Sequence, residues 1–415
     1  MFDKQTTSTE INVDTAYRDF ENVFPAVSIC LNKGMNTDEI KRNINPIFIR
    51  VNKSEVKLTY RHFKAIQSYL FLNYLEPVES INMEHCTDLN ETCGVDFYSF
   101  RERVTPKTCE GIIKKMYYLG KEENCTKYFE KFSTQFGICF VANSLYTKKM
   151  NGTVKMKDFK SLKMRYKNNE NLERSLEIHY TKNELFFYQL IIHTPEELPD
   201  GRQQKIQLRK LGEITKVFVK TVEFHNYPDV KDESIKARNC RFPFERFDNG
   251  LPYSLNFCMY IKRVERELKT CNCTLPLVLD GDNSKICQLK DFACISNLSK
   301  EVKANTAKDR NLLMNYIGDC LVPLCITMEI SKVGEYDQKF HINDLGGIKI
   351  EVINKPTLRY VRRVSFSRLD LSVQLGGIIG LFFGASVLSI LEIFYLICRV
   401  CRFNVRRLFD YLRTF

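Results

Sequence analysis

Three polar residues recur at every third position inside the most apolar stretch of the chain. Ser386, Ser389 and Glu392 would occupy an arc of about 120° on a helix with 3.6 residues per turn. Polar groups are costly inside a bilayer unless they face a lumen or a partner. The spacing therefore predicts a polar face that could line an ion pathway. A salt bridge from Glu392 to an arginine of the following tail is an equally open interpretation.

Glycines on the same stretch could serve helix packing. Gly376, Gly380 and Gly384 recur every four residues, and Gly377 adjoins the first of them. Small residues at this spacing let helix backbones approach closely. Close packing in a receptor dimer is the alternative to a pore, and these residues alone leave both possibilities open.

Nothing in the sequence indicates catalysis. The histidines form no HExxH pattern and no metal-ligand spacing, and no Gly-x-Ser-x-Gly motif accompanies them. We therefore predict no enzyme activity, no catalytic residue, no metal and no cofactor. His193, beside Thr194, is predicted to be a strand-end residue. The six histidines are His62, His85, His179, His193, His225 and His341.

A single apolar segment must position the polar arc. Residues 375–398 carry one charge, Glu392, and at 1.5 Å per residue they span about 36 Å, compared with about 30 Å for a bilayer core. Arginines dominate the residues that follow, so the positive-inside rule places the tail in the cytoplasm. The predicted organisation is an extracellular domain over 1–374, a transmembrane helix over 375–398 and a basic cytoplasmic tail over 399–415, in the plasma membrane.

Cysteines and glycosylation motifs indicate an oxidising compartment for the first part of the chain. Fourteen of the 16 cysteines lie between Cys30 and Cys325. Cys398 and Cys401 lie in the predicted cytoplasmic region, where palmitoylation and unmodified thiols are both open. Six Asn-x-Ser/Thr motifs are candidate glycosylation sites. They are Asn52, Asn90, Asn124, Asn151, Asn272 and Asn297.

The net charge of +12 does not indicate nucleic-acid binding, because lysines are scattered among acidic residues and no nucleic-acid-binding motif accompanies them.

Hydrophobic periodicity predicts helices over 60–76, 110–132 and 257–270, and strands over 24–30, 184–193, 214–224 and within 347–364. The helix over 257–270 presents Cys258, Ile261, Val264 and Leu268 on one face. The predicted fold class is α+β: a disulfide-rich mixed extracellular domain followed by a C-terminal transmembrane helix.

Residues 1–24 contain neither an apolar signal segment nor a second spanning stretch. A large extracellular domain needs such a segment for delivery across the membrane. Either the last apolar helix acts as its own signal, or the natural N-terminus lies upstream of Met1, and we expect the second.

Several motifs together resemble the degenerin and epithelial sodium channel family, and within it the arthropod pickpocket-type members. The resemblance is carried by Phe24-Pro25-Ala26-Val27-Ser28-Ile29-Cys30, by Gly137-Ile138-Cys139-Phe140 and by His193-Thr194-Pro195. The most specific part runs from Leu375 to Ser386 and continues to Leu391-Glu392.

The resemblance implies a trimeric channel, assembled from identical or related subunits, that is selective for sodium ions, blocked by amiloride and gated through its extracellular domain. It implies that Gly384, Ala385 and Ser386 form the selectivity filter, with Ser389 and Glu392 lining the pore. The family has a small residue at the outer mouth of the pore, where a bulky side chain holds channels open. This chain has Val373 at that position, so the resemblance implies that its gating differs from the usual behaviour of the family.

The resemblance also implies intrachain disulfides. Lys262 replaces one cysteine of the family pattern, and the later cluster keeps only Cys320 and Cys325, so one bridge is absent. The implied pairs are Cys30–Cys139, Cys240–Cys325, Cys258–Cys320, Cys271–Cys294 and Cys273–Cys287. The rival interpretation of the whole chain is a single-pass receptor or adhesion protein whose helix only anchors it.

Overall fold

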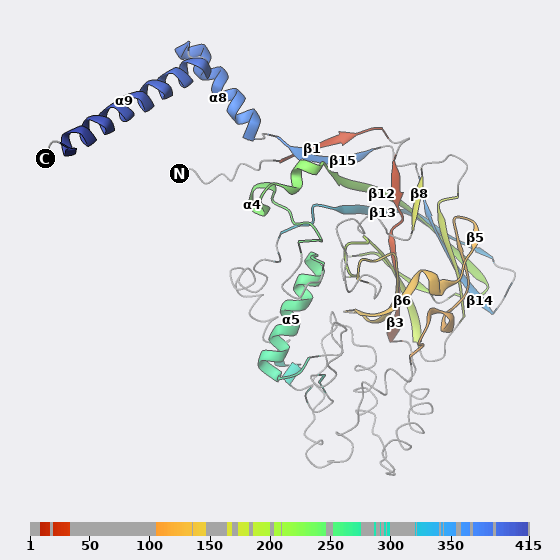
Figure 1. The fold of residues 1–415 in the computed structure, drawn as a ribbon. Coiled ribbons are helices and arrows are strands. Elements are labelled where there is room, and N and C mark those ends of the chain that lie inside the picture. Colours follow the sequence, from red (N-terminus) through yellow and green to blue (C-terminus); the bar gives the residue numbers. More distant parts are fainter. Residues whose placement is uncertain are drawn as a thin grey trace. The chain divides into compact units, whose positions relative to one another are not determined.

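The computed structural model does not describe residues 34–104 and 299–319, and it describes most of the other residues (Figure 1). The described ranges are 9–16, 20–33, 105–134, 136–146, 164–167, 173–181, 186–199, 203–208, 210–245, 252–274, 322–339, 344–353, 358–365, 368–384 and 387–413, with single positions at 286, 287, 291, 294, 295, 297, 298, 320 and 342. The predicted helix over 60–76 lies outside them. These residues form two compact units, one made of 1–12, 227–238 and 362–415 and the other of 13–226 and 239–361.

The largest sheet has eight strands. Its order is β1 (Thr9–Asp14), β15 (Arg359–Val364), β12 (Glu213–Asn226), β14 (Leu345–Val352), β9 (Ser175–Thr181), β4 (Ile113–Tyr118) and β5 (Lys121–Glu122), and β13 (Thr327–Lys339) also pairs with β12. β13 and β12 are antiparallel, whereas β14 runs parallel to β12. A bulge interrupts the ladder next to Phe218, which pairs with Gly334, while Val219 pairs with Lys332. Val333 of β13 is therefore an extra residue that pairs with no residue of β12.

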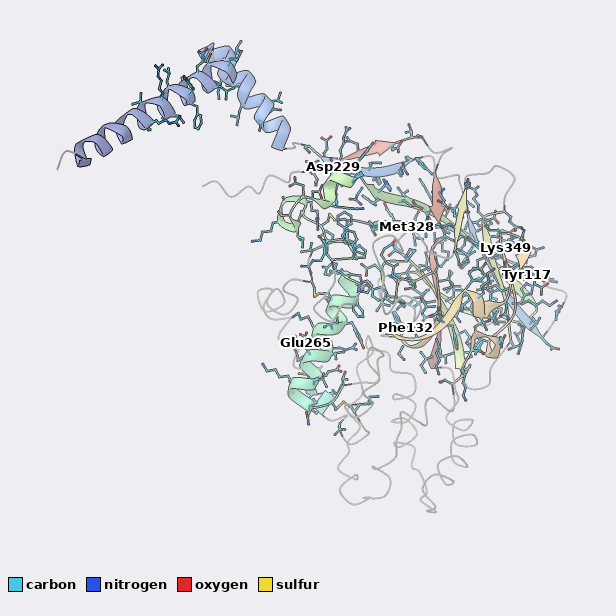
Figure 2. The ribbon with its side chains drawn as sticks, viewed as in Figure 1. Tyr117, Phe132, Asp229, Glu265, Met328 and Lys349 are labelled. Carbon is cyan, nitrogen blue, oxygen red and sulfur yellow. A yellow bond between two sulfur atoms is a disulfide. The ribbon has the colours of Figure 1, made fainter. Side chains whose placement is uncertain are left out.

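A five-stranded antiparallel sheet carries much of the remaining core. Its order is β11 (Lys205–Leu208), β10 (Phe186–His193), β3 (Ala26–Lys33), β7 (Gly137–Ala142) and β6 (Phe129–Thr134). The residues of β3 from Ala26 to Leu31 are all buried, as expected for a central strand that is covered on both faces. A third sheet pairs β2 (Glu21–Val23) with β8 (Arg165–Lys167). Phe132, which Figure 2 labels, is one of the buried side chains of β6.

Short helices complete the described parts. They are η3 (Cys109–Gly111), η4 (Cys125–Lys127), η7 (Pro228–Lys231) and α4 (Ile235–Arg238), beside the longer α5 (Leu255–Cys271), α8 (Arg368–Phe383) and α9 (Val387–Arg413). This mixture of strands, helices and disulfides confirms the predicted mixed, disulfide-rich class. The predicted strands correspond to β3, β10 and β12, and the stretch 347–364 contains most of β14 and all of β15.

The predicted helix over 110–132 is wrong. These residues form β4, β5, η4 and the start of β6. Leu119 and Gly120 have φ angles of 51° and 76°, and Tyr118 pairs with Lys121 across them, so they are the central residues of a tight hairpin turn. The spacing of apolar residues resembled a helix because short apolar runs do not distinguish the two structures by themselves.

Helix α5 confirms the amphipathic prediction for 257–270. It begins after Ser254, whose hydroxyl accepts a hydrogen bond from the Phe257 amide at 3.2 Å, and it ends at Asn272 in the left-handed conformation. Cys258 of the predicted face is buried, whereas Ile261, Val264 and Leu268 are half-buried. The helix also buries Phe257, whose ring contacts the Tyr146 ring in a tilted arrangement with centroids 4.9 Å apart.

Disulfides join cysteines that are distant in the sequence. The structure contains bridges between Cys30 and Cys139, Cys240 and Cys325, Cys258 and Cys320, Cys271 and Cys294, and Cys273 and Cys287, the same pairs that the resemblance implies. Cys30 and Cys139 lie directly opposite each other in the ladder between β3 and β7. A bridge between Cys109 and Cys125 was not among the predictions. Cys86 and Cys93 lie outside the described residues.

We expect peptide mapping without reduction to recover Cys109 joined to Cys125, because η3 and η4 bring these residues to a Cα–Cα distance of 6.2 Å. Replacing both by serine should lower the free energy of unfolding by about 3 kcal/mol, the chain-entropy value for a loop of this length. A reduced and alkylated sample provides the control. Linkage of either cysteine to Cys86 or Cys93 would contradict the assignment.

Candidate functional site

The apolar C-terminal segment forms two helices instead of one. α8 ends at Phe383 and α9 begins at Val387, so the predicted uninterrupted helix over 375–398 is wrong in its continuity. Figure 1 shows the two helices meeting at an angle. Gly384 lies at the break, whereas Ala385 and Ser386, the other predicted filter residues, lie outside the described residues.

The backbone of Gly384 explains why α8 ends there. Its φ angle is +61°, in the left-handed region that costs other L-residues roughly 1–2 kcal/mol. A Cβ at this position would meet no atom within 4 Å, so the glycine is required for conformation and not for space. Glycine in this conformation is a frequent helix terminator because it lets the last carbonyl groups find other donors.

The glycines of α8 have a different environment. A Cβ on Gly376 or Gly377 would also meet no atom within 4 Å in the described part of one chain. Both have exposed positions, and Gly380 is half-buried. Their predicted role in packing requires a second helix beside α8, and it stays a prediction.

Large apolar side chains are exposed along both helices. Val373 is 65% exposed, Leu381 82% and Leu388 71%. Apolar surface of this extent requires an apolar environment or a partner. No single helix among the described residues is long and apolar enough to cross a membrane by itself. The predicted crossing over residues 375–398 stays a prediction.

Ser389 and Glu392, the predicted pore-lining residues, lie about one helical turn apart on α9. Ser389 is half-buried and Glu392 is exposed. No ion pair joins Glu392 to Arg399 or Arg402, the tail arginines whose side chains the structure describes. Cys398 and Cys401, further along α9, are exposed free thiols.

His193 is fully occupied as a hydrogen-bonding group. It ends β10, as predicted, and only 1% of its surface is exposed. Its Nδ1 lies 2.9 Å from the Thr194 carbonyl, which can only accept, so Nδ1 donates, and its Nε2 is hydrogen-bonded to the Ser28 hydroxyl at 2.7 Å. This arrangement orders the junction of β3 and β10. Among the described residues, no group of three or more His, Cys, Asp or Glu side chains could hold a metal ion.

A buried carboxylic acid, Glu196, and a half-buried one, Glu223, interact in the larger unit. Burial raises the pKa of Glu196 to about 8, and the charges of Glu223 and Glu197 add to this rise. Glu196 Oε2 has no hydrogen-bond partner among the described residues. Burial also raises the pKa of Glu223, whose Oε1 accepts a hydrogen bond from the Val23 amide at 3.0 Å. Sequence analysis missed this pair because nothing in Pro195-Glu196-Glu197 indicates which carboxyl is buried.

Three of the six candidate glycosylation sites are described. Asn124, Asn272 and Asn297 all have exposed side chains. Asn124 caps η4 by accepting from the Thr126 amide at 2.9 Å. Asn52, Asn90 and Asn151 lie outside the described residues. Glycan attachment stays a prediction at all six positions.

Comparison with known proteins gives one family match and two relatives. Residues 1–396 match the family model described as amiloride-sensitive sodium channel. Pickpocket protein 19 of Drosophila melanogaster is 22% identical over 404 residues, which cover 90% of this chain and 76% of the relative. Sodium channel protein Nach of Drosophila ananassae is 26% identical over 315 residues, which cover 71% of this chain and 58% of the relative.

Replacing Gly384 by alanine should favour a continuous helix through the break. The left-handed conformation would cost alanine roughly 1–2 kcal/mol, whereas helix propensity favours alanine over glycine by about 1 kcal/mol. Hydrogen exchange of the full chain in lipid nanodiscs should then show greater protection of the amides just after residue 384. Gly376→Ala, within α8, is the control and should leave these amides unchanged. Equal protection in Gly384→Ala and the unmodified chain would contradict the explanation.

The free energy of unfolding should fall as pH rises from about 4.5 to about 8, because unfolded Glu196 loses its proton near its ordinary pKa while the folded protein retains it up to about 8. Glu196→Gln should weaken this dependence and stabilise the chain more at pH 8 than at pH 5. Urea unfolding of the larger unit at both pH values measures the effect. Glu122→Gln, at an exposed position of β5, is the control. An unchanged pH dependence in Glu196→Gln would exclude this carboxyl as the source.

Proposed function

Because the chain belongs to the amiloride-sensitive sodium channel family, we propose that it is a subunit of a sodium-conducting channel of the plasma membrane. Membership in a family of ion channels confirms the resemblance found in the sequence and the prediction that the chain is not an enzyme. The name of one relative, Sodium channel protein Nach, supports sodium as the transported ion.

The helix break at Gly384 is the observation that carries the proposal. Ending a helix inside a hydrocarbon layer leaves backbone N–H and carbonyl groups without their partners four residues away, at a cost of several kcal/mol for each group. Such a break is tolerated where the backbone is buried in protein or lines a water-filled path. A helix that only anchors a receptor would have no need of one. The break therefore supports a selectivity filter at Gly384, Ala385 and Ser386.

In this proposal the freed carbonyl groups and the Ser386 hydroxyl replace part of the hydration shell of a sodium ion. Ser389 and Glu392 follow on α9 at a spacing of three residues, so they share one face and extend the polar path. The Glu392 carboxylate adds negative charge that attracts cations and repels anions. Gly376, Gly377 and Gly380 let α8 approach the neighbouring helix closely.

Three chains, identical or related, surround the pore in the proposed assembly. Its extracellular part is residues 1–374, and residues 399–415 are cytoplasmic. Opening responds to a ligand or another stimulus acting on the extracellular domain, and amiloride blocks the current. The exposed side chains of α8 and α9 then contact lipid and neighbouring subunits. Glycans on the six sequons, and acyl chains on Cys398 and Cys401, are further expectations of this topology.

The rival interpretation, a single-pass receptor or adhesion protein, makes a different electrical prediction. Surface expression of the full-length gene product with ion-substitution electrophysiology separates the two, because a receptor carries no current. Replacing external sodium by a large organic cation should abolish inward current if the channel proposal is correct. Normal surface expression without any sodium-dependent current, alone or with related subunits, would exclude it.

Val373 and Ser386 should respond in opposite ways to a change of size. Val373→Ala should lower the resting sodium current, because a smaller side chain lets the helices close; a change of about 1.4 kcal/mol in the closed state would alter the closed-to-open ratio about tenfold. Ser386→Leu should instead reduce conductance or sodium preference without restoring closure.

The matched control is Val13→Ala, at an exposed valine of β1. Resting current and single-channel conductance are compared at equal surface expression. The assignment is wrong if Val373→Ala leaves the resting current unchanged, or if Ser386→Leu leaves both conductance and ion preference intact.

A further inference from the structure

A groove of about 720 Å³ lies beside β13 in the larger unit. One of its walls carries His193, Thr194 and Lys205, from the end of β10 and the start of β11, and the other carries Met328, Ile330 and Lys332 of β13. We name it the β13 groove. Its volume falls in the usual range of small-molecule sites, about 300–1,000 Å³.

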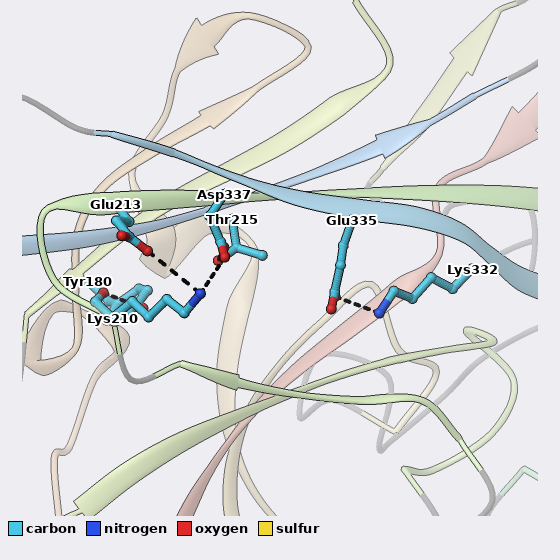
Figure 3. Close-up of polar contacts among 7 residues, drawn as sticks. All are labelled: Tyr180, Lys210, Glu213, Thr215, Lys332, Glu335 and Asp337. Carbon is cyan, nitrogen blue, oxygen red and sulfur yellow. Dashed lines mark hydrogen bonds and ion pairs between the residues drawn. The ribbon is translucent and has the colours of Figure 1, made fainter.

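Two lysines supply the positive charge of the β13 groove. The Lys332 side chain is only 22% exposed, and its ammonium group contacts Glu335 at 2.5 Å (Figure 3). An ammonium group has three donors, so this one carboxylate leaves capacity for another acceptor. Lys205 lies over the Phe136 ring at 4.7 Å and forms no ion pair among the described residues.

Two groups of the lining that can accept hydrogen bonds, His193 and Glu197, are already engaged. Both nitrogens of His193 are hydrogen-bonded, to Ser28 and to the Thr194 carbonyl. The Glu197 carboxylate accepts from the Asn256 amide at 3.3 Å, at the first turn of α5. The Thr194 hydroxyl, in contrast, is a buried group with no hydrogen-bond partner among the described residues. The charged residues of the lining are Lys205, Lys332 and Glu197, so the groove carries one more positive charge than negative charge.

Apolar side chains complete the lining. Met328, labelled in Figure 2, is 5% exposed, and Val219 of β12 is 1% exposed. Ile192 and Ile330 also contribute to the walls. A fully hydrated inorganic ion would gain nothing from this surface, whereas an apolar body would lose contact with water.

We infer that the β13 groove binds a small organic carboxylate, whose charged group is held by Lys332 and Lys205 and whose hydrocarbon part lies against Met328 and Ile330. The site is a property of the larger unit, so it holds whether or not the chain conducts sodium.

Calorimetric titration of the full chain in lipid nanodiscs tests the inference, with hexanoate as the probe. Hexanoate should bind saturably, whereas hexan-1-ol and hexylamine, which have the same chain length without negative charge, should bind at least about tenfold more weakly. Equal binding of hexanol and hexanoate would overturn the inference, and so would the absence of saturable hexanoate binding.

Variants locate the site. Lys332→Met should weaken hexanoate binding at least about tenfold, and Lys205→Met should weaken it to a lesser degree because that lysine is more exposed. Glu335→Gln should strengthen binding several-fold, because it removes the carboxylate that competes for Lys332. This gain separates a binding role from a folding defect.

Lys121→Met, on β5, is the matched control and should leave the affinity unchanged. Unchanged affinity in both Lys332→Met and Glu335→Gln would place the probe elsewhere and overturn the inference. Loss of the site only in an assembled oligomer would show that a neighbouring subunit occupies the groove, which would also overturn it.

Discussion

The backbone ladders of β12 are the interaction on which the largest sheet depends. Its residues Glu213 to Phe224 pair along one edge with β13, while β14 and β15 are its other partners. A central strand with partners on both edges fixes the register of each neighbour, because a slip of one residue would turn every side chain to the opposite face. The buried Val217 and Val219 show how strictly this alternation is used. The position of β13, and with it one wall of the groove, follows from this pairing.

Around α5, disulfide bonds provide stabilisation in addition to the burial of apolar side chains. Cys258 near the start of the helix is tied to Cys320, and Cys271 at its end is tied to Cys294. A further bridge joins Cys273, just after the helix, to Cys287. Bridges of this kind act mainly by limiting the unfolded chain. The hydroxyl of Tyr253 adds a buried hydrogen bond of 2.6 Å to the Val322 carbonyl, so the base of the helix is ordered by polar contacts as well.

The C-terminal helices α8 and α9 are not stabilised by a core within the described part of the chain. Their side chains are mostly exposed within one chain, so their stability must come from the surroundings that cover them. Only the backbone conformation of Gly384 is determined locally. Glycine adopts the left-handed conformation at the end of α8 without any tertiary contact that would stabilise it. A channel pore built at this break would combine a locally determined turn with packing that several chains determine together.

The sequence alone determined the features that depend on local composition and periodicity. The cysteine-rich first part, the capped helix α5, the strands β3, β10 and β12 and the apolar C-terminal segment were all predictable, because each is encoded by residues that are neighbours in the chain. The tertiary structure alone decided the rest. Residues 110–132 became strands because β9 pairs with β4, and Glu196 was buried because distant elements cover it. The β13 groove likewise joins Lys205 and Lys332, which lie 127 positions apart, and no local pattern can encode such a meeting.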